Sequence, residues 1–299
     1  MKKLIISIVV VFLFFSCDNI KREYYTNGSL KSEYYELEEG IYDGTFKNYY
    51  ESGNIKSIAK FNKGKLSDTV FNFYDDQDKK IKFLRIYSDS ICLKQVEYNK
   101  NDFIKGEGYV CTDKMLRNGK WKFFKESGRI DFIREYKLID NKQYLNQIWY
   151  LNKEGDTLYT PSKYFEVQLI KDTITVGEAV LGAVIMKSPF FKKEASAIRV
   201  FLPSEEEKNF VFDFSNEREI KLDTFYNLIA DKKNQKNFEG FSKPYTTAFG
   251  KRLKKITGKY NLRGIIEESY IESDSLLKAT KMYFDIPIYI KDIPTSSRL

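Results

Sequence analysis

Residues 44–55 read GTFKNYYESGNI, and residues 119–130, 75 positions later, read GKWKFFKESGRI with no gap between the two. A shift of 25 positions brings residues 24–32, YYTNGSLKS, onto residues 49–57, YYESGNIKS. Because 75 is three times 25, the chain carries tandem copies of one short unit. Weaker copies begin near residues 73, 98 and 149.

Each copy has one position occupied by Gly, Asp or Asn, the residues that best tolerate a positive φ. These predicted turn positions are Gly28, Gly53, Asp78, Asn101, Gly128 and Gly155, at spacings of 25, 25, 23, 27 and 27 residues. A turn residue at a regular spacing between apolar segments predicts a β-hairpin in every copy.

Polar and apolar residues alternate on both sides of the turn, as in Phe46, Asn48 and Tyr50 before it and Ile55 and Ser57 after it. Alternation with aromatic and β-branched residues is typical of strands. A single hairpin is marginally stable, so the copies are expected to stack against one another. The sequence therefore predicts an all-β fold that begins with an elongated antiparallel meander of hairpin repeats.

The repeated pattern is two aromatic residues, two variable residues, Gly, a variable residue, Leu or Ile, Lys and Ser. It resembles the MORN-repeat variants of the YwqK type over roughly residues 21–160, and we assign residues 22–160 to the repeats. The resemblance implies a repeat architecture and brings no catalytic residue with it. Proteins of this type are labelled antitoxin components, which makes neutralisation of a toxin one candidate function.

Beyond residue 160 the repeat ends and a different strand pattern begins. Residues 172–185 are expected to form a strand, a turn and a second strand. Further strand-like runs are expected at 165–169, 197–202, 209–214, 260–266 and 281–291. Residues 174–178 and 259–264 resemble early and late strands of an immunoglobulin-like or fibronectin-like domain. We therefore expect a β-sandwich over residues 163–293 and a tail at 294–299.

The amino terminus has the layout of an export signal. Met1, Lys2 and Lys3 precede 12 uncharged residues at 4–15. A transmembrane helix is the alternative, but it needs about 20 apolar residues. Residues 1–16 are thus expected to be cleaved, which lowers the formal charge from +8 to +6 by removing the two lysines.

Ser16 and Cys17 resemble the lipobox of bacterial lipoproteins, in which the cysteine receives a diacylglyceryl group before cleavage. The resemblance implies a lipid anchor on Cys17, with residues 17–21 as anchor and tether. Two or three acyl chains hold a protein stably on a membrane. We expect the cell envelope as location, with the protein on the periplasmic or surface face of the outer membrane.

Two cysteines remain once Cys17 carries lipid. In an oxidising compartment, Cys92 and Cys111 can close a loop of about 19 residues, a bond worth about 3 kcal/mol in the chain-entropy model. The alternative is two free thiols packed in strands, and the sequence favours neither.

The chain has no histidine, which excludes Ser-His-Asp and Cys-His mechanisms and the usual catalytic zinc sites. We assign no catalytic residue, metal site or cofactor, and we expect no nucleic-acid partner. The favoured function is a non-enzymatic binding or scaffolding module for a protein or another envelope macromolecule. The alternatives are an antitoxin-like or immunity-like protein and an envelope hydrolase that uses two carboxylates.

Replacing Cys17 with Ser tests the anchor. We expect Cys17→Ser either to leave the membrane fraction or to stay there with its export signal uncleaved, and in both cases without unfolding, because the lipid is lost while the fold does not depend on it. Fractionation of cells and the size of the protein on a gel measure this, and circular dichroism of the purified variant checks the fold. A mature Cys17→Ser variant that aggregated when expressed alone would contradict the assignment.

Overall fold

The computed structural model describes residues 20–88, 90–111, 114–191, 196–204, 208–253, 257–271 and 277–292. Cys17, the export segment and the tail lie outside these ranges. Within them the chain is all-β, with three short 3₁₀ turns and no helix long and apolar enough to cross a membrane. The chain divides into two compact units at residues 87 and 88, and each is described by itself.

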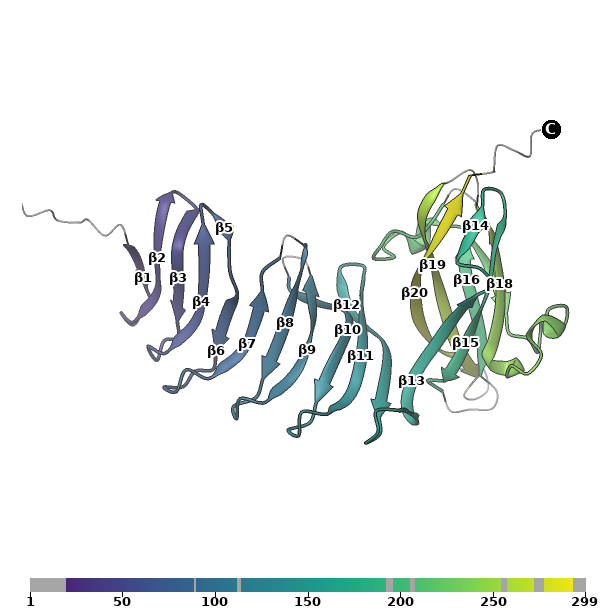
Figure 1. The fold of residues 1–299 in the computed structure, drawn as a ribbon, viewed down its shortest axis with the longest axis horizontal. Helices are drawn as coiled ribbons and strands as arrows, with labels where there is room; N and C mark the ends of the chain where they lie inside the picture. The colour runs from purple at the N-terminus through teal and green to yellow at the C-terminus, as the bar shows by residue number, and fades with distance from the viewer. Residues whose placement is uncertain are drawn as a thin grey trace, which may run out of the picture. The chain divides into compact units, whose positions relative to one another are not determined.

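The first unit forms an antiparallel meander (Figure 1). Its strands are β1 (Ile20–Tyr24), β2 (Leu30–Glu38), β3 (Ile41–Tyr49), β4 (Ile55–Asn62), β5 (Lys65–Leu66), β6 (Val70–Phe73) and β7 (Ile81–Ile86). Each strand pairs with the next, except that both β5 and β6 pair with β4. Strand β1 begins at Ile20, inside the expected tether, so the sheet starts two residues before the predicted border at 22.

The two faces of this sheet differ in chemistry because neighbouring residues of a strand point to opposite sides. One face carries Glu33 with its ion pairs to Arg22 and Lys47, both 3.2 Å. The other carries a cluster of half-buried rings in which Tyr34 stacks on Phe46 with centroids 4.8 Å apart. Tyr42 and Phe61 complete that cluster.

The repeat hairpins share one loop conformation. In the first copy the Tyr25 N–H donates to Ser29 O and the Gly28 N–H donates back to Tyr25 O, at 2.8 and 2.9 Å. The same pair of bonds recurs around Gly53, Gly128 and Gly155. These glycines have φ values of 82°, 87°, 80° and 94°, as their turn positions require.

Two of the predicted turn positions are wrong by one residue. Positive φ is found at Lys79 and Asp102 rather than at Asp78 and Asn101. The Asn99 loop has the same bonds as the glycine copies, which makes its fourth residue, Asp102, the left-handed one. Residue type led to the wrong position here, because Lys79 is not a residue that favours a positive φ and because Asn101 and Asp102 are both residues that tolerate one.

Neighbouring loops are tied together by side chains. Tyr25 and Tyr50 are half-buried and donate to Tyr49 O at 2.7 Å and Phe73 O at 2.9 Å. Asp75 accepts hydrogen bonds from both Ser52 and Asn54 of the preceding loop, so this acidic turn links two copies.

The second unit contains further hairpins followed by a sandwich (Figure 1). The hairpin strands are β8 (Cys92–Tyr98), β9 (Ile104–Cys111), β10 (Leu116–Phe124), β11 (Ile130–Ile139) and β12 (Lys142–Leu151). Strand β13 (Thr157–Leu169) pairs with β12 through its first half and with β15 through its second. The predicted border between repeats and sandwich, at 160–163, therefore lies inside one continuous strand.

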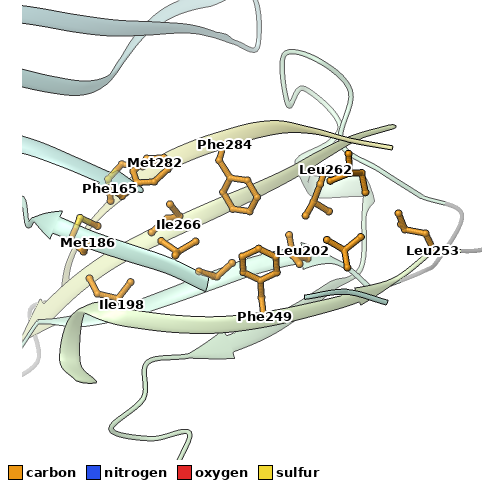
Figure 2. Close-up of a cluster of buried hydrophobic side chains, with 14 of the residues drawn as sticks. Phe165, Met186, Ile198, Leu202, Phe249, Leu253, Leu262, Ile266, Met282 and Phe284 are labelled. Atoms are coloured by element: carbon orange, nitrogen blue, oxygen red, sulfur yellow. The ribbon is translucent and has the colours of Figure 1, made fainter. Parts of the chain in front are cut away.

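The sandwich is built from two sheets that face each other. Its other strands are β14 (Thr173–Thr175), β15 (Ala179–Ser188), β16 (Ala197–Pro203), β17 (Leu222–Tyr226), β18 (Thr246–Arg252), β19 (Gly258–Ile271) and β20 (Leu277–Lys291). The sheet β13-β15-β18 faces the sheet β14-β20-β19-β16-β17. Side chains from both sheets fill the core between them, where Phe249 stacks on Phe284 with centroids 6.0 Å apart (Figure 2).

One predicted strand of the sandwich is wrong. Residues 209–214 form turns rather than a strand. Phe214 has a φ of 55°, and the Val211 N–H donates to Asn216 Oδ1, so local side-chain bonds replace a strand ladder. The apolar residues of this segment, Phe210 and Phe214, instead form a buried cluster with Ile265 and Tyr283.

In the repeat sheet of this unit, the missing side chain of Gly108 leaves the space that the ring of Trp121 occupies. Trp121 of β10 is fully buried, and its ring lies over Gly108 of β9. A Cβ at position 108 would lie 2.5 Å from three ring atoms.

We expect Gly108→Ala to lower the free energy of unfolding by about 1 to 3 kcal/mol, because the enclosed ring cannot move away from the added methyl group. Urea denaturation followed by tryptophan fluorescence measures this, since Trp121 and Trp149 both lie in the second unit. Lys105→Ala, an exposed change on the same strand, is the control. Equal midpoints for the two variants would contradict the packing argument.

Candidate functional site

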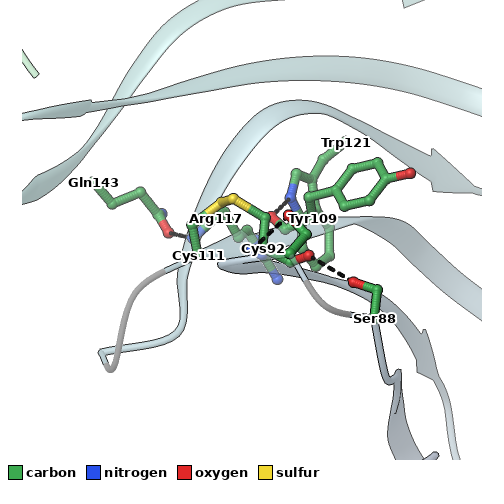
Figure 3. The surroundings of a disulfide bond; sticks show 8 residues. Ser88, Cys92, Tyr109, Cys111, Arg117, Trp121 and Gln143 are labelled. Atoms are coloured by element: carbon green, nitrogen blue, oxygen red, sulfur yellow. Dashed lines mark hydrogen bonds between the residues drawn. A yellow bond between two sulfur atoms is a disulfide. The ribbon is translucent and has the colours of Figure 1, made fainter. Parts of the chain in front are cut away.

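The structure joins Cys92 and Cys111 in a disulfide (Figure 3). The two residues lie directly opposite each other on β8 and β9, with Cα atoms 4.1 Å apart and an S–S distance of 2.04 Å. Of the two alternatives that the sequence left open, the structure has the bridge.

Beside the bridge, Arg117 is the centre of a packed polar cluster. Its guanidinium makes two hydrogen bonds to the Glu97 carboxylate, at 2.8 and 3.0 Å, and lies 4.3 Å from the Trp121 ring centre. The Trp121 Nε1–H donates to Tyr109 O, and Gln143 accepts from the Arg117 N–H (Figure 3). These groups satisfy one another, so the cluster is a structural feature of the sheet rather than a binding site.

A cleft of about 330 Å³ lies elsewhere in the second unit, between the repeat strands and the sandwich. One side is a face of β10, β11 and β12, and the other side comes from β13 and β20. Its walls carry both aromatic and charged side chains, which makes it the candidate site.

A bulge in β12 holds the two sides of this cleft together. Glu135 lies opposite Gln147, the next residue pair is Tyr136 with Leu145, and Asn146 is the extra residue. The Asn146 and Gln147 amides both donate to Glu135 Oε2, at 2.6 and 2.8 Å. The bulge thus turns two neighbouring amides towards one carboxylate.

Asn146 also binds the main chain of the sandwich. Its Nδ2 donates to Tyr283 O at 2.9 Å, and its Oδ1 accepts from the Tyr283 N–H at 2.8 Å. Tyr144 donates to Lys281 O at 2.6 Å, and the Phe165 N–H donates to Gln147 at 2.9 Å. Asn146 is fully buried, so these bonds are shielded from water and fix β12 against β20 and β13.

Two rings and a lysine form the aromatic part of the cleft. Trp149 and Tyr164 lie with centroids 5.9 Å apart at an interplanar angle of 44°, and Lys120 Nζ lies 4.8 Å from the Trp149 ring centre. Burial, and then the nearby Glu166, raises the pKa of Tyr164. The hydroxyl therefore stays protonated at neutral pH and can both donate and accept a hydrogen bond.

Three carboxylates line the cleft, and each is already bound by other side chains. Glu135 accepts from the two amides, Glu166 pairs with Lys187 at 3.2 Å, and Asp285 pairs with Arg263 at 2.9 Å. Across the described ranges, no group of three or more Cys, Asp or Glu side chains could hold a metal ion. The chemistry that the cleft offers is hydrogen bonding, ring contact and charge.

One repeat of the chain matches a family of known proteins. Residues 42–63, which form the β3–β4 hairpin around Gly53, match the family described as MORN repeat variant. No curated protein matches the chain. The match supports the interpretation that the repeats act as a binding or scaffolding module.

No residue of this cleft was predicted as a site residue from the sequence. The cleft residues are far apart in the chain, and only one local signal was available. Asn146 and Gln147 interrupt an otherwise apolar strand pattern, LNQIWYL at 145–151. Two adjacent amides inside such a strand indicate a bulge or a buried polar contact.

We expect Asn146→Ala to lower the free energy of unfolding of the second unit by about 1 to 3 kcal/mol, because it leaves the buried Tyr283 N–H and C=O without partners. Hydrogen exchange at the Tyr283 amide should also become faster. Asn118→Ala on β10 is the matched control, since its side chain makes no hydrogen bond within the described structure. Unchanged exchange at Tyr283 would show that Asn146 does not hold the sandwich.

Proposed function

We propose that this protein is a non-enzymatic lipoprotein that acts as a binding or scaffolding module in the cell envelope, anchored by lipid on Cys17. The observation that carries the proposal is the cleft of the second unit, whose two sides are fixed by Asn146 while its charged and aromatic groups remain at the surface. A rigid, partly aromatic concavity is the usual form of a binding site.

The first unit supports the same function in a second way. Its described strands form one layer, so the rings around Phe46 are only half-buried on an open face. The ion pairs of Glu33 occupy the opposite face. A sheet with one aromatic and one charged face offers two different surfaces to other molecules.

Two finer assignments belong to this proposal. The first is that the repeats over residues 21–160 are of the YwqK type, which the recurring glycine loops favour. The second is that the sandwich is immunoglobulin-like. Strands β13, β15 and β18 take the places of strands A, B and E, and β16, β19 and β20 those of C, F and G. Strand β17 beside β16 corresponds to the added strand C′ of variable domains.

The alternatives have less support. An antitoxin or immunity role rests on the repeat resemblance alone. A carboxylate-dependent hydrolase needs one carboxyl group that is free to act as an acid. The cleft does contain Glu135, Glu166 and Asp285, but amide groups hold the first, and a cationic side chain neutralises each of the others.

Site-specific photo-crosslinking in intact cells tests the binding function. We expect a photoreactive residue at Trp149 or Tyr42 to give a discrete adduct with another envelope molecule, because both side chains lie on the proposed binding surfaces. The same residue at Lys153, on a loop, is the control. Adducts that were equally strong at all three positions, or absent at all three, would contradict the proposal.

A further inference from the structure

Two lysines of the cleft in the second unit have no carboxylate partner within the described residues. Lys120 and Lys137 both line the cleft, and no described carboxylate lies within ion-pair distance of either ammonium. By contrast, the lining carboxylates Glu166 and Asp285 are paired with Lys187 and Arg263. The two lysines are therefore the groups available to an incoming anion.

Lys120 is held in place by a ring. Its Nζ lies 4.8 Å from the centre of Trp149, an arrangement that fixes the ammonium without neutralising it. The side of the ammonium that faces away from the ring keeps N–H donors for another partner. The cleft thus presents a positioned charge beside an apolar surface.

Glu135 adds an acceptor next to these cations. It lies in register between Lys120 on β10 and Gln147 on β12, so the three residues form one row across the sheet. Its Oε2 atom accepts from both amides, which leaves Oε1 as an acceptor for a hydroxyl group. The protonated Tyr164 hydroxyl provides a second polar partner beside Trp149.

We propose that this cleft binds an acidic sugar residue of a polysaccharide or glycan. The rings of Trp149 and Tyr164 contact the apolar face of the sugar, Lys120 and Lys137 bind its carboxylate, and Glu135 accepts from a hydroxyl group. This inference rests on the binding function proposed above and names its ligand class.

The shape of the cleft favours a sugar over an extended peptide. A peptide that adds to a sheet needs an unpaired strand edge for its main chain. The wall formed by β10, β11 and β12 is a sheet face whose strands are already paired with one another. A volume of about 330 Å³ also lies at the small end of ligand pockets, which suits one or two sugar rings.

Calorimetric titration of the mature protein with trigalacturonic acid tests the proposal. We expect binding that weakens as salt is raised, because the carboxylate contacts are exposed to screening. Trp149→Ala and Lys137→Gln should each raise the dissociation constant by about tenfold or more, which corresponds to a loss of about 1.4 kcal/mol in binding free energy. Tyr109→Ala and Lys105→Gln, exposed changes outside the cleft, should leave it unchanged.

Two comparison ligands separate the contributions. The methyl ester of trigalacturonic acid keeps the rings and removes the charge, and a triaspartate peptide keeps the charge and removes the rings. Equal binding of the ester would overturn the acidic requirement, and equal binding of the peptide would overturn the sugar. No binding of trigalacturonic acid would overturn the ligand assignment. A crosslinked partner at Trp149 in that case would still support the binding function.

Near-ultraviolet circular dichroism of Lys137→Gln and Trp149→Ala checks that both variants are folded. If Trp149→Ala fails this check, Lys137→Gln and the two comparison ligands decide the question alone. If both variants bind like the unmodified protein, the cleft is not the site and the proposal is wrong.

Discussion

A single-layer sheet has no second layer to cover its faces, and none of the apolar side chains described in the first unit is fully buried. The hairpins of this unit are held by main-chain pairing and by bonds from one loop to the next, such as Tyr25 to Tyr49 O and Tyr50 to Phe73 O. In both of these loops, a left-handed glycine closes the turn that begins at the tyrosine. Because order is carried along the sheet from copy to copy, stability depends on nearest neighbours, as in other repeat proteins.

In the second unit the hairpins are joined to a sandwich, whose two sheets cover each other. Strand β13 pairs with the repeats through one half and with β15 through the other, and Asn146 binds the main chain of β20. The core between the sandwich sheets then adds to the smaller buried cluster around Trp121 in the repeats. The cleft exists because two differently built parts meet at a fixed distance.

Much of the fold was predictable because it depends on local patterns. The period of about 25 residues and the alternation around Gly53 were sufficient to predict hairpins and an all-β class. Lys79 and Asp102 were missed because the loop conformation, rather than the residue type, decides which position becomes left-handed. The segment around Phe214 was read as a strand because its apolar residues alternate, although side-chain bonds hold it in turns.

The cleft was not predictable by the same means. Lys120, Trp149 and Tyr164 come from three strands, and nothing in their spacing along the chain relates them. Their proximity depends on the register between β10, β11 and β12 and on the bulge at Asn146. Register is a long-range property, and a shift of one residue would move these side chains to the opposite face.

If the protein is held at its amino terminus, as proposed, the disulfide also has a mechanical consequence. A pull on the chain before Cys92 passes through the sulfur atoms directly to Cys111, so the β8–β9 hairpin is bypassed. The chain from Cys92 to Cys111, a sequence separation of 19, could otherwise extend to roughly 65 Å. The disulfide prevents this extension. The force is therefore carried by the strands that follow Cys111, while the β8–β9 hairpin stays folded.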